Sequence, residues 1–233
     1  MLDDLQHACR RLVSRPGASA LAVAMLALAV GLTTGMFTLL DALVLRPVPF
    51  RHPDTLVQLS VGGDHTRRNV VSPAVLRAWQ ASGIFQSVEA ATAGTSLLEG
   101  GSGLLARPSA VVTPGVFDML GVRPLEGRLF AADEGRAGAD DRVILSEDVW
   151  RGAFGRDPDL VGKRIMIDGQ SALVVGILPA SFRFPAWDTV VWMPIDYQAR
   201  GPARANSQAT PYARLAATVP EQEALRRAMD VAI

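Results

Sequence analysis

The side chains that most often perform catalysis or bind metals are scattered along this sequence. Its three histidines, His7, His52 and His65, lie far apart. A catalytic triad or a histidine metal site would need such side chains to converge. The one cysteine, Cys9, excludes both an intrachain disulfide and a cysteine-rich metal site. We therefore predict no catalytic residue, no cofactor and no metal site.

One acidic loop is the remaining candidate cation site. It carries Asp133, Glu134, Asp140 and Asp141 without the ligand spacing of an EF-hand. Such a loop is typical of a solvated surface, and we expect that role here. Gly162-Lys163 lacks the other residues of a phosphate-binding P-loop. The four tryptophans (Trp79, Trp150, Trp187 and Trp192) are expected to pack in the core.

The composition is balanced in charge but uneven in hydrophobicity. The 233 residues include 23 Lys and Arg and 23 Asp and Glu. This balance leaves no basic field for nucleic acid, so we predict no nucleic-acid partner. Hydrophobic residues make up 49% of the chain, and their excess is concentrated in residues 18–45. The remainder has the composition of a water-soluble domain.

The apolar stretch predicts a transmembrane helix over residues 17–45. Residues 18–40 contain no charged side chain, and this run exceeds the roughly 20 residues that a spanning helix needs. It is also longer than the apolar core of a cleavable signal peptide. Three arginines precede it: Arg10, Arg11 and Arg15. The positive-inside rule then places the N-terminus in the cytoplasm and residues after about 46 outside.

Residues 1–16 place their apolar side chains near one face of a helix, which favours a short cytoplasmic helix lying in the membrane interface. A frayed basic tail is the alternative. Pro16 and Gly17 would form the turn into the span.

Small residues form a stripe on the predicted span. Ala27, Gly31, Gly35 and Thr38 share one helical face, and Gly31 and Gly35 form a G-x-x-x-G pair. Small residues let two helices in lipid approach closely. We therefore predict that this seam packs against another transmembrane helix, in the same chain or in another. The threonine hydroxyls can bond to carbonyls one turn back.

The region beyond the span predicts an α+β domain. "TLVQLS" reads as a strand, Ser72 and Pro73 start a helix, and "FQSVEAATAGTSLL" reads as a second strand. Further on, Ser146 caps a helix that follows the strand "RVILS", and Asp168-Gly169 joins two strands in a hairpin. The tail gives a strand and a helix starting near Pro220, so a second β-α-β unit would lack its last strand.

Five blocks occur in a specific order along the chain: "LLDALVLRPVPF", "SPAVLRAW", "VTPGVFDMLGVRPLEGRLF", "VILSEDVWRGAFGRDPDLVGKRIMIDGQSALVVGILP" and "FRFPAWDTVVWMPI". Together they closely resemble the MacB/FtsX-type ABC transporter permeases, and more narrowly the duplicated orphan permeases of that superfamily. The resemblance implies an extracytoplasmic domain over residues 46–233. Its porter-like β-α-β parts would cover about 55–98 and 211–233, with an inserted mixed α/β subdomain at about 105–200.

The resemblance also implies a function. Such permeases couple ATP hydrolysis by a separate cytoplasmic ABC ATPase to export or extraction of a substrate, in a dimeric assembly in the bacterial inner membrane. The family has further transmembrane helices, so we expect this chain to be a C-terminally truncated, N-terminal part. The alternative is a single-pass anchored binding or chaperone module without transport. A membrane-anchored enzyme is a third hypothesis, for which the sequence supplies no motif.

Overall fold

The computed structural model describes residues 16–40, 50–59, 71–101, 103–135, 141–195, 209–216, 223–224 and 226–228. The chain divides into two compact units, Met1–Val48 and Pro49–Ile233, each described here by itself. The predicted interfacial helix lies outside the described residues except for Pro16. The last part of the predicted span, residues 41–45, also lies outside them.

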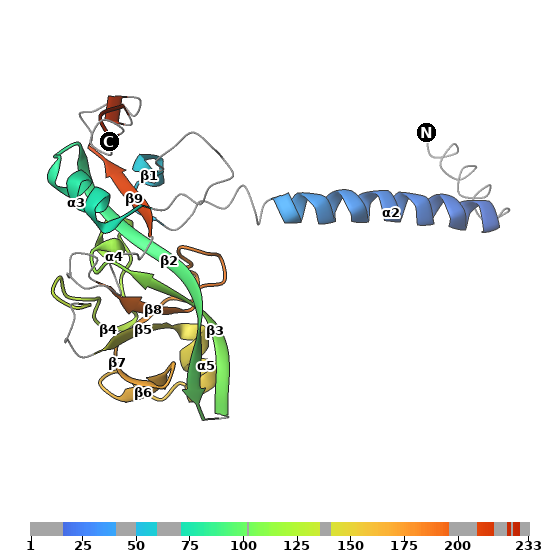
Figure 1. Ribbon diagram of the computed structural model, residues 1–233. Helices are drawn as coiled ribbons and strands as arrows, with labels where there is room; N and C mark the ends of the chain where they lie inside the picture. Colours follow the sequence, from blue (N-terminus) through green and yellow to red (C-terminus); the bar gives the residue numbers. More distant parts are fainter. Residues whose placement is uncertain are drawn as a thin grey trace. The chain divides into compact units, whose positions relative to one another are not determined.

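The described part of the first unit is one helix, α2, from Pro16 to Leu40 (Figure 1). Its 25 residues carry no charge, and large apolar side chains such as Leu26 and Met36 are exposed. The Thr33 hydroxyl donates to the Ala29 carbonyl at 2.6 Å, and Thr38 donates to Thr34 at 2.8 Å, which confirms the expected back-bonding. Among the described residues, no helix combines the length and the hydropathy required to cross a membrane.

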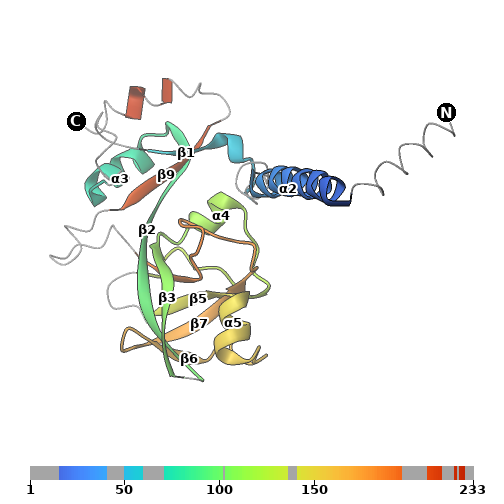
Figure 2. The same ribbon diagram turned by 90° about the vertical axis from the view of Figure 1, so that its right-hand side faces the viewer.

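The second unit is built on one mixed sheet. Its described strands are β1 (Leu56–Gln58), β2 (Phe85–Gly100), β3 (Gly103–Val112), β4 (Glu126–Gly127), β5 (Arg142–Ser146), β6 (Arg164–Ile167), β7 (Gln170–Leu178), β8 (Val191–Pro194) and β9 (Thr210–Leu215). They follow the order β1-β9-β2-β3-β8-β5-β7-β4, and β6 pairs with β2 and β7. The long β2–β3 hairpin joins the two ends of the unit (Figures 1 and 2).

Short helices cover this sheet. They are η2 (Pro53–Thr55), α3 (Pro73–Ala81), α4 (Val116–Leu120) and α5 (Glu147–Phe154). Two of them, α3 and α5, begin with the predicted serine caps. The Ser72 hydroxyl accepts from the Val75 N–H at 3.5 Å, and Ser146 accepts from Val149 at 3.3 Å. Each serine therefore satisfies a backbone donor that the first turn leaves free.

The predicted β-α-β unit is present in a split form. β1 and β2, which flank α3 in the sequence, both pair antiparallel with β9, which lies between them. Helical residues 223–224 and 226–228 follow β9, and Ala224 and Ala228 pack in the same cluster as α3. The Trp79 indole N–H donates to the Ala228 carbonyl at 2.8 Å. The sequence predicted the strand-helix-strand segment of β1, α3 and β2 and the strand-helix segment that begins with β9. It did not predict that β9 would lie between β1 and β2.

The predicted hairpin is confirmed at β6 and β7. Asp168 and Gly169 have φ angles of 52° and 77°. Two successive positive φ angles are those of the tight turn that matches the twist of antiparallel strands. The Asp168 side chain also accepts from the Leu97 N–H at 2.7 Å, which fixes this hairpin to β2.

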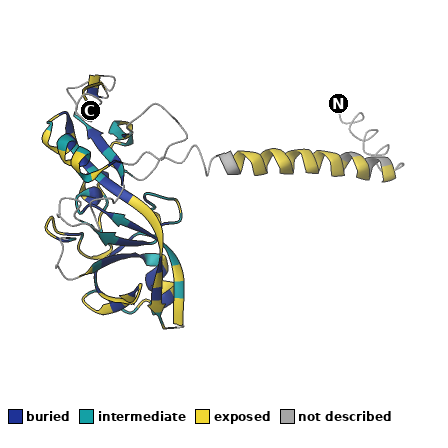
Figure 3. Cartoon of the chain, viewed as in Figure 1, coloured by how far each residue is buried: buried dark blue, intermediate teal, exposed yellow. Residues whose placement is uncertain are grey.

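Three hydrophobic clusters form the core of the second unit, one at each end and one around α4 (Figure 3). Trp79, Trp150 and Trp192 are buried as predicted. The prediction for Trp187 is wrong, because 84% of its surface is exposed. Trp187 lies at the corner of a tight turn in which Ala186 and Thr189 exchange two hydrogen bonds, so it is directed away from the core.

Candidate functional site

The first described residues of the second unit pack tightly against the rest of that unit. We call residues 50–55 the docking segment. The Phe50 ring lies edge-on to Phe182 and to Phe184, with both pairs of centroids 6.1 Å apart. Phe182 also packs against Trp192 at 5.5 Å, inside the central cluster. The docking segment is therefore anchored in the aromatic core, where edge-to-face pairs add to the burial energy.

The backbone of the docking segment is fixed to the end of α4. The Arg51 N–H donates to the Leu120 carbonyl at 2.9 Å. Gly121 follows in the left-handed region, with φ 73°, and a Cβ at this glycine would lie 2.5 Å from the Cβ of Arg51. Glycine is required at position 121 for two reasons: it tolerates the positive φ, and its lack of a side chain leaves room for Arg51.

Arg214 of β9 joins three parts of the fold. Its Nη2 donates to the carbonyls of Arg51 and Met119, both at 2.5 Å, and its Nη1 donates to the His52 carbonyl at 3.1 Å. Nη1 also donates to the Thr55 hydroxyl at 2.6 Å. A single planar guanidinium thus connects the docking segment, α4 and the sheet, which suits its rigid fork of five donors.

The electrostatics of this joint are unusual. Arg214 is only 7% exposed, and among the described residues no carboxylate pairs with it. Burial lowers the pKa of Arg214, and the positive charge of Arg51 lowers it further. Carbonyl dipoles replace the counter-ion, and removal of the guanidinium would leave several buried acceptors unsatisfied. The joint is therefore sensitive to any displacement of the docking segment.

A groove of about 690 Å³ opens beside the joint. Its lining includes Arg51, His52, Glu89, Gly115, Asp118 and Arg214. The Glu89 carboxylate accepts a short hydrogen bond from the Thr113 hydroxyl. Burial raises the pKa of Glu89; the Thr113 bond opposes this rise and the charge of Asp118 adds to it. The groove therefore combines charged groups of both signs.

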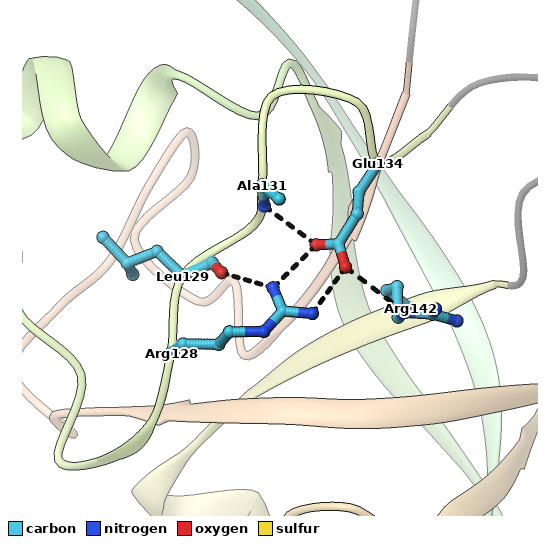
Figure 4. Close-up of polar contacts among 5 residues, drawn as sticks. All are labelled: Arg128, Leu129, Ala131, Glu134 and Arg142. Carbon is cyan, nitrogen blue, oxygen red and sulfur yellow. Dashed lines mark hydrogen bonds and ion pairs between the residues drawn. The ribbon is translucent and has the colours of Figure 1, made fainter.

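Glu134 departs from the solvated role that the sequence predicted for the acidic loop, whereas Asp133 and Asp141 are exposed as expected and Asp140 lies outside the described residues. Glu134 is 9% exposed and accepts hydrogen bonds from Arg128 at 2.6 and 3.0 Å and from the Ala131 N–H at 2.9 Å (Figure 4). Arg142 of β5 lies 3.3 Å away. Burial raises the pKa of Glu134, but the Arg128 and Ala131 hydrogen bonds and the two arginine charges bring it below its ordinary value. Glu134 therefore acts as a structural clamp, because it holds its own loop to Arg128 before the loop and to Arg142 of β5 after it.

The predicted helix-packing seam lies wholly on α2. Ala27, Gly31, Gly35 and Thr38 are all exposed, and a Cβ added at either glycine would meet no atom within 4 Å. The seam has space for a partner and stays a prediction. His7 and His65 lie outside the described residues, whereas His52 lines the groove. Within the described ranges, no cluster of histidine, cysteine or acidic residues could hold a metal.

The sequence reasoning missed Arg214 and Glu89. One signal was available for Arg214, which stands in the strand "TPYARL" between alanine and leucine. A charged residue within an apolar strand that is buried must find partners, which could have marked it for attention. Glu89 carried no such signal, because its surroundings are set by residues 24 to 29 positions further along the chain.

Comparison with known proteins assigns this chain to a family. The family model described as "MacB-like periplasmic core domain" matches residues 19–231, so the chain belongs to this family. It carries the MacB-like periplasmic domain of an ABC-type transporter permease, with a mixed α/β fold. Among curated proteins no relative matches.

Two solved structures show the same fold. The periplasmic region of MacB from Actinobacillus actinomycetemcomitans is 15% identical, with a TM-score of 0.61 over 78% of this chain and 84% of that one. The extracellular domain of the noncanonic ABC-type transporter YknZ from Gram-positive bacteria is 14% identical, with a TM-score of 0.54 over 75% and 93%. Both domains lie outside the cytoplasm, and at these identities the likeness concerns the fold.

Proposed function

We propose that this chain belongs to the permease subunit of an ABC-type transporter and transmits mechanical force. A separate cytoplasmic ATPase would drive the membrane helices, and the extracytoplasmic domain would follow their motion to export or extract a substrate. The observation that carries this proposal is the joint at Arg214. Residues 50–55, which follow α2 in the sequence, share the Arg214 side chain of β9 with the end of α4. A displacement of these residues would therefore pull on both β9 and α4.

The proposal includes a membrane anchor at residues 17–45, with the N-terminus in the cytoplasm. Its support is the uncharged helix α2 with exposed apolar side chains, together with the arginines that precede it. The seam at Ala27, Gly31, Gly35 and Thr38 would then pack against other helices of the permease. Alkaline phosphatase fused after Ile233 is expected to be active and fluorescent protein at the same site dark. The reverse pattern would refute the orientation.

Force transmission is tested in the permease reconstituted with its ATPase in lipid nanodiscs. Spin labels at Gln58 and at Thr92, both exposed, report motion within the domain. ATP is expected to shift the distance distribution between the labels. Arg214→Lys, which keeps the charge but loses the planar fork, is expected to reduce that shift while ATP hydrolysis continues. If ATP leaves the wild-type distribution unchanged, the domain does not transmit force.

A further inference from the structure

The groove beside the joint holds a carboxylate, that of Glu89, at its wall. Oε2 of Glu89 accepts from the Thr113 hydroxyl. The Ala90 N–H donates to the same hydroxyl oxygen at 2.9 Å, and Glu89 is nearer to the hydroxyl than its other acceptor, the Ala90 carbonyl at 3.3 Å. Among the described residues, no lysine, arginine or histidine forms an ion pair with this carboxylate. Glu89 lines the groove and is only partly buried, and a carboxylate has about four acceptor sites, so the group can accept further hydrogen bonds from a ligand.

The backbone makes room for this carboxylate. A Cβ on Gly115 would overlap the position of Oε1 of Glu89. Gly115 has φ −75°, so the backbone itself does not require glycine there. The missing side chain instead leaves a notch that the Glu89 carboxyl group fills, at the wall of the groove. Alanine at this position would push the carboxyl group aside without straining the chain.

The other charged residues of the groove define what it could hold. Asp118 adds a second acid, Arg214 is engaged by backbone carbonyls, and Arg51 and His52 bring basic groups from the docking segment. A simple cation would be repelled by Arg51, and a simple anion by Glu89. We propose that the groove binds a small zwitterion, with a primary ammonium group on Glu89 and an anionic group toward Arg51.

The chemistry of the two groups supports this assignment. A primary ammonium has three N–H donors and forms short, charge-assisted hydrogen bonds to carboxylates. The guanidinium of Arg51 suits a phosphate or carboxylate. Burial raises the pKa of Glu89, and an ammonium group bound beside it would favour the ionised carboxylate. Two sources share this chemistry: a free amino-phosphate and the headgroup of an ethanolamine phospholipid.

The test uses the purified full chain in detergent micelles and measures amide chemical shifts by NMR. O-phosphoethanolamine is added as the free probe. In a second arm, the micelles are doped with phosphatidylethanolamine or, as a matched control, with phosphatidylglycerol. Saturable shifts at Ala90 and Gly115 with the free probe support a soluble ligand. Shifts only with the ethanolamine lipid support a headgroup. No shift in either arm overturns the proposal.

Variants separate the ammonium contact from general charge effects. Glu89→Gln is expected to weaken binding about tenfold or more, because a charge-assisted bond is lost. Gly115→Ala is expected to weaken it as well, by displacing the carboxyl group. Glu126→Gln, an exposed acid on β4, is the control that leaves affinity unchanged. Equal affinity for inorganic phosphate, or wild-type affinity in Glu89→Gln, would overturn the ammonium assignment. These measurements involve no ATPase, so their result is independent of force transmission.

Discussion

Arg214 fixes the end of α4 by donating twice to one carbonyl. Its Nη2 lies 2.5 Å and its Nε 3.2 Å from the Met119 oxygen. Arg214 and Met119 are 95 positions apart in the sequence. The same guanidinium donates to the docking segment, so one side chain connects α4, β9 and residues 50–55.

Arg214→Met is expected to lower the free energy of unfolding by about 3 kcal/mol, because buried carbonyls lose their donor. Hydrogen exchange should rise first at the Arg51 amide, which is bonded to Leu120. Chemical denaturation and exchange mass spectrometry measure the two effects. Arg151→Met is the matched control, since Arg151 forms only an exposed pair with Glu147. Equal effects in both variants would show that Arg214 has no special role.

Glu134→Gln is expected to destabilise the domain by about 2 kcal/mol at neutral pH, through loss of charged hydrogen bonds. The pKa of Glu134 is held below its ordinary value of 4.5, so its contribution is present above that pH. It is lost as the pH falls through the lowered pKa of the folded state. Thermal melts of the variant and parent should therefore converge in acid. A constant difference at all pH values would contradict this account.

Glu89→Gln is expected to stabilise the domain at neutral pH, which is the opposite of the effect expected for Glu134→Gln. The pKa of Glu89 is raised by burial, so the folded state binds its proton more tightly than the unfolded chain does. Its contribution to stability is full below the ordinary value of 4.5 and is lost as the pH rises through the raised pKa. Glutamine avoids the buried charge, and the variant should melt higher than the parent at neutral pH. Below pH 4.5 this advantage should vanish.

Two tryptophans provide a matched pair. Trp192 is fully buried and its indole N–H donates to the Phe184 carbonyl at 2.7 Å, whereas Trp187 is 84% exposed. Trp192→Ala is expected to cost about 4 kcal/mol through the cavity left in the core. Trp187→Ala should change stability by less than about 0.5 kcal/mol. Urea unfolding measures both, and a large effect of Trp187→Ala would reveal packing that this fold does not account for.

The seam on α2 predicts a change in helix association. Gly31→Ile and Gly35→Ile should each weaken self-association or partner binding in a membrane reporter assay, because branched side chains keep the backbones apart. Leu28→Ile, which lies mostly off the seam, should have little effect. Unchanged association in the glycine variants would remove the seam as a packing surface.

The family model and the solved structures confirm the family resemblance, the mixed α/β fold and a domain that lies outside the cytoplasm in its relatives. The local elements were also predictable, because their signals are local. Ser72 and Ser146 cap helices, and Asp168-Gly169 forms the hairpin turn, since a cap or a tight turn depends on a few adjacent residues.

The sequence by itself determined the caps, the turn, the uncharged helix and the succession of strands along the chain, because neighbouring residues or period-two patterning specify them. Tertiary structure alone decided the rest. It placed β9 between β1 and β2, turned Trp187 outward, buried Glu134 against two arginines and set Arg214 on three segments. The physical reason is that a buried charge takes its partners from whichever residues the fold brings within hydrogen-bond distance, and no local pattern encodes that distance.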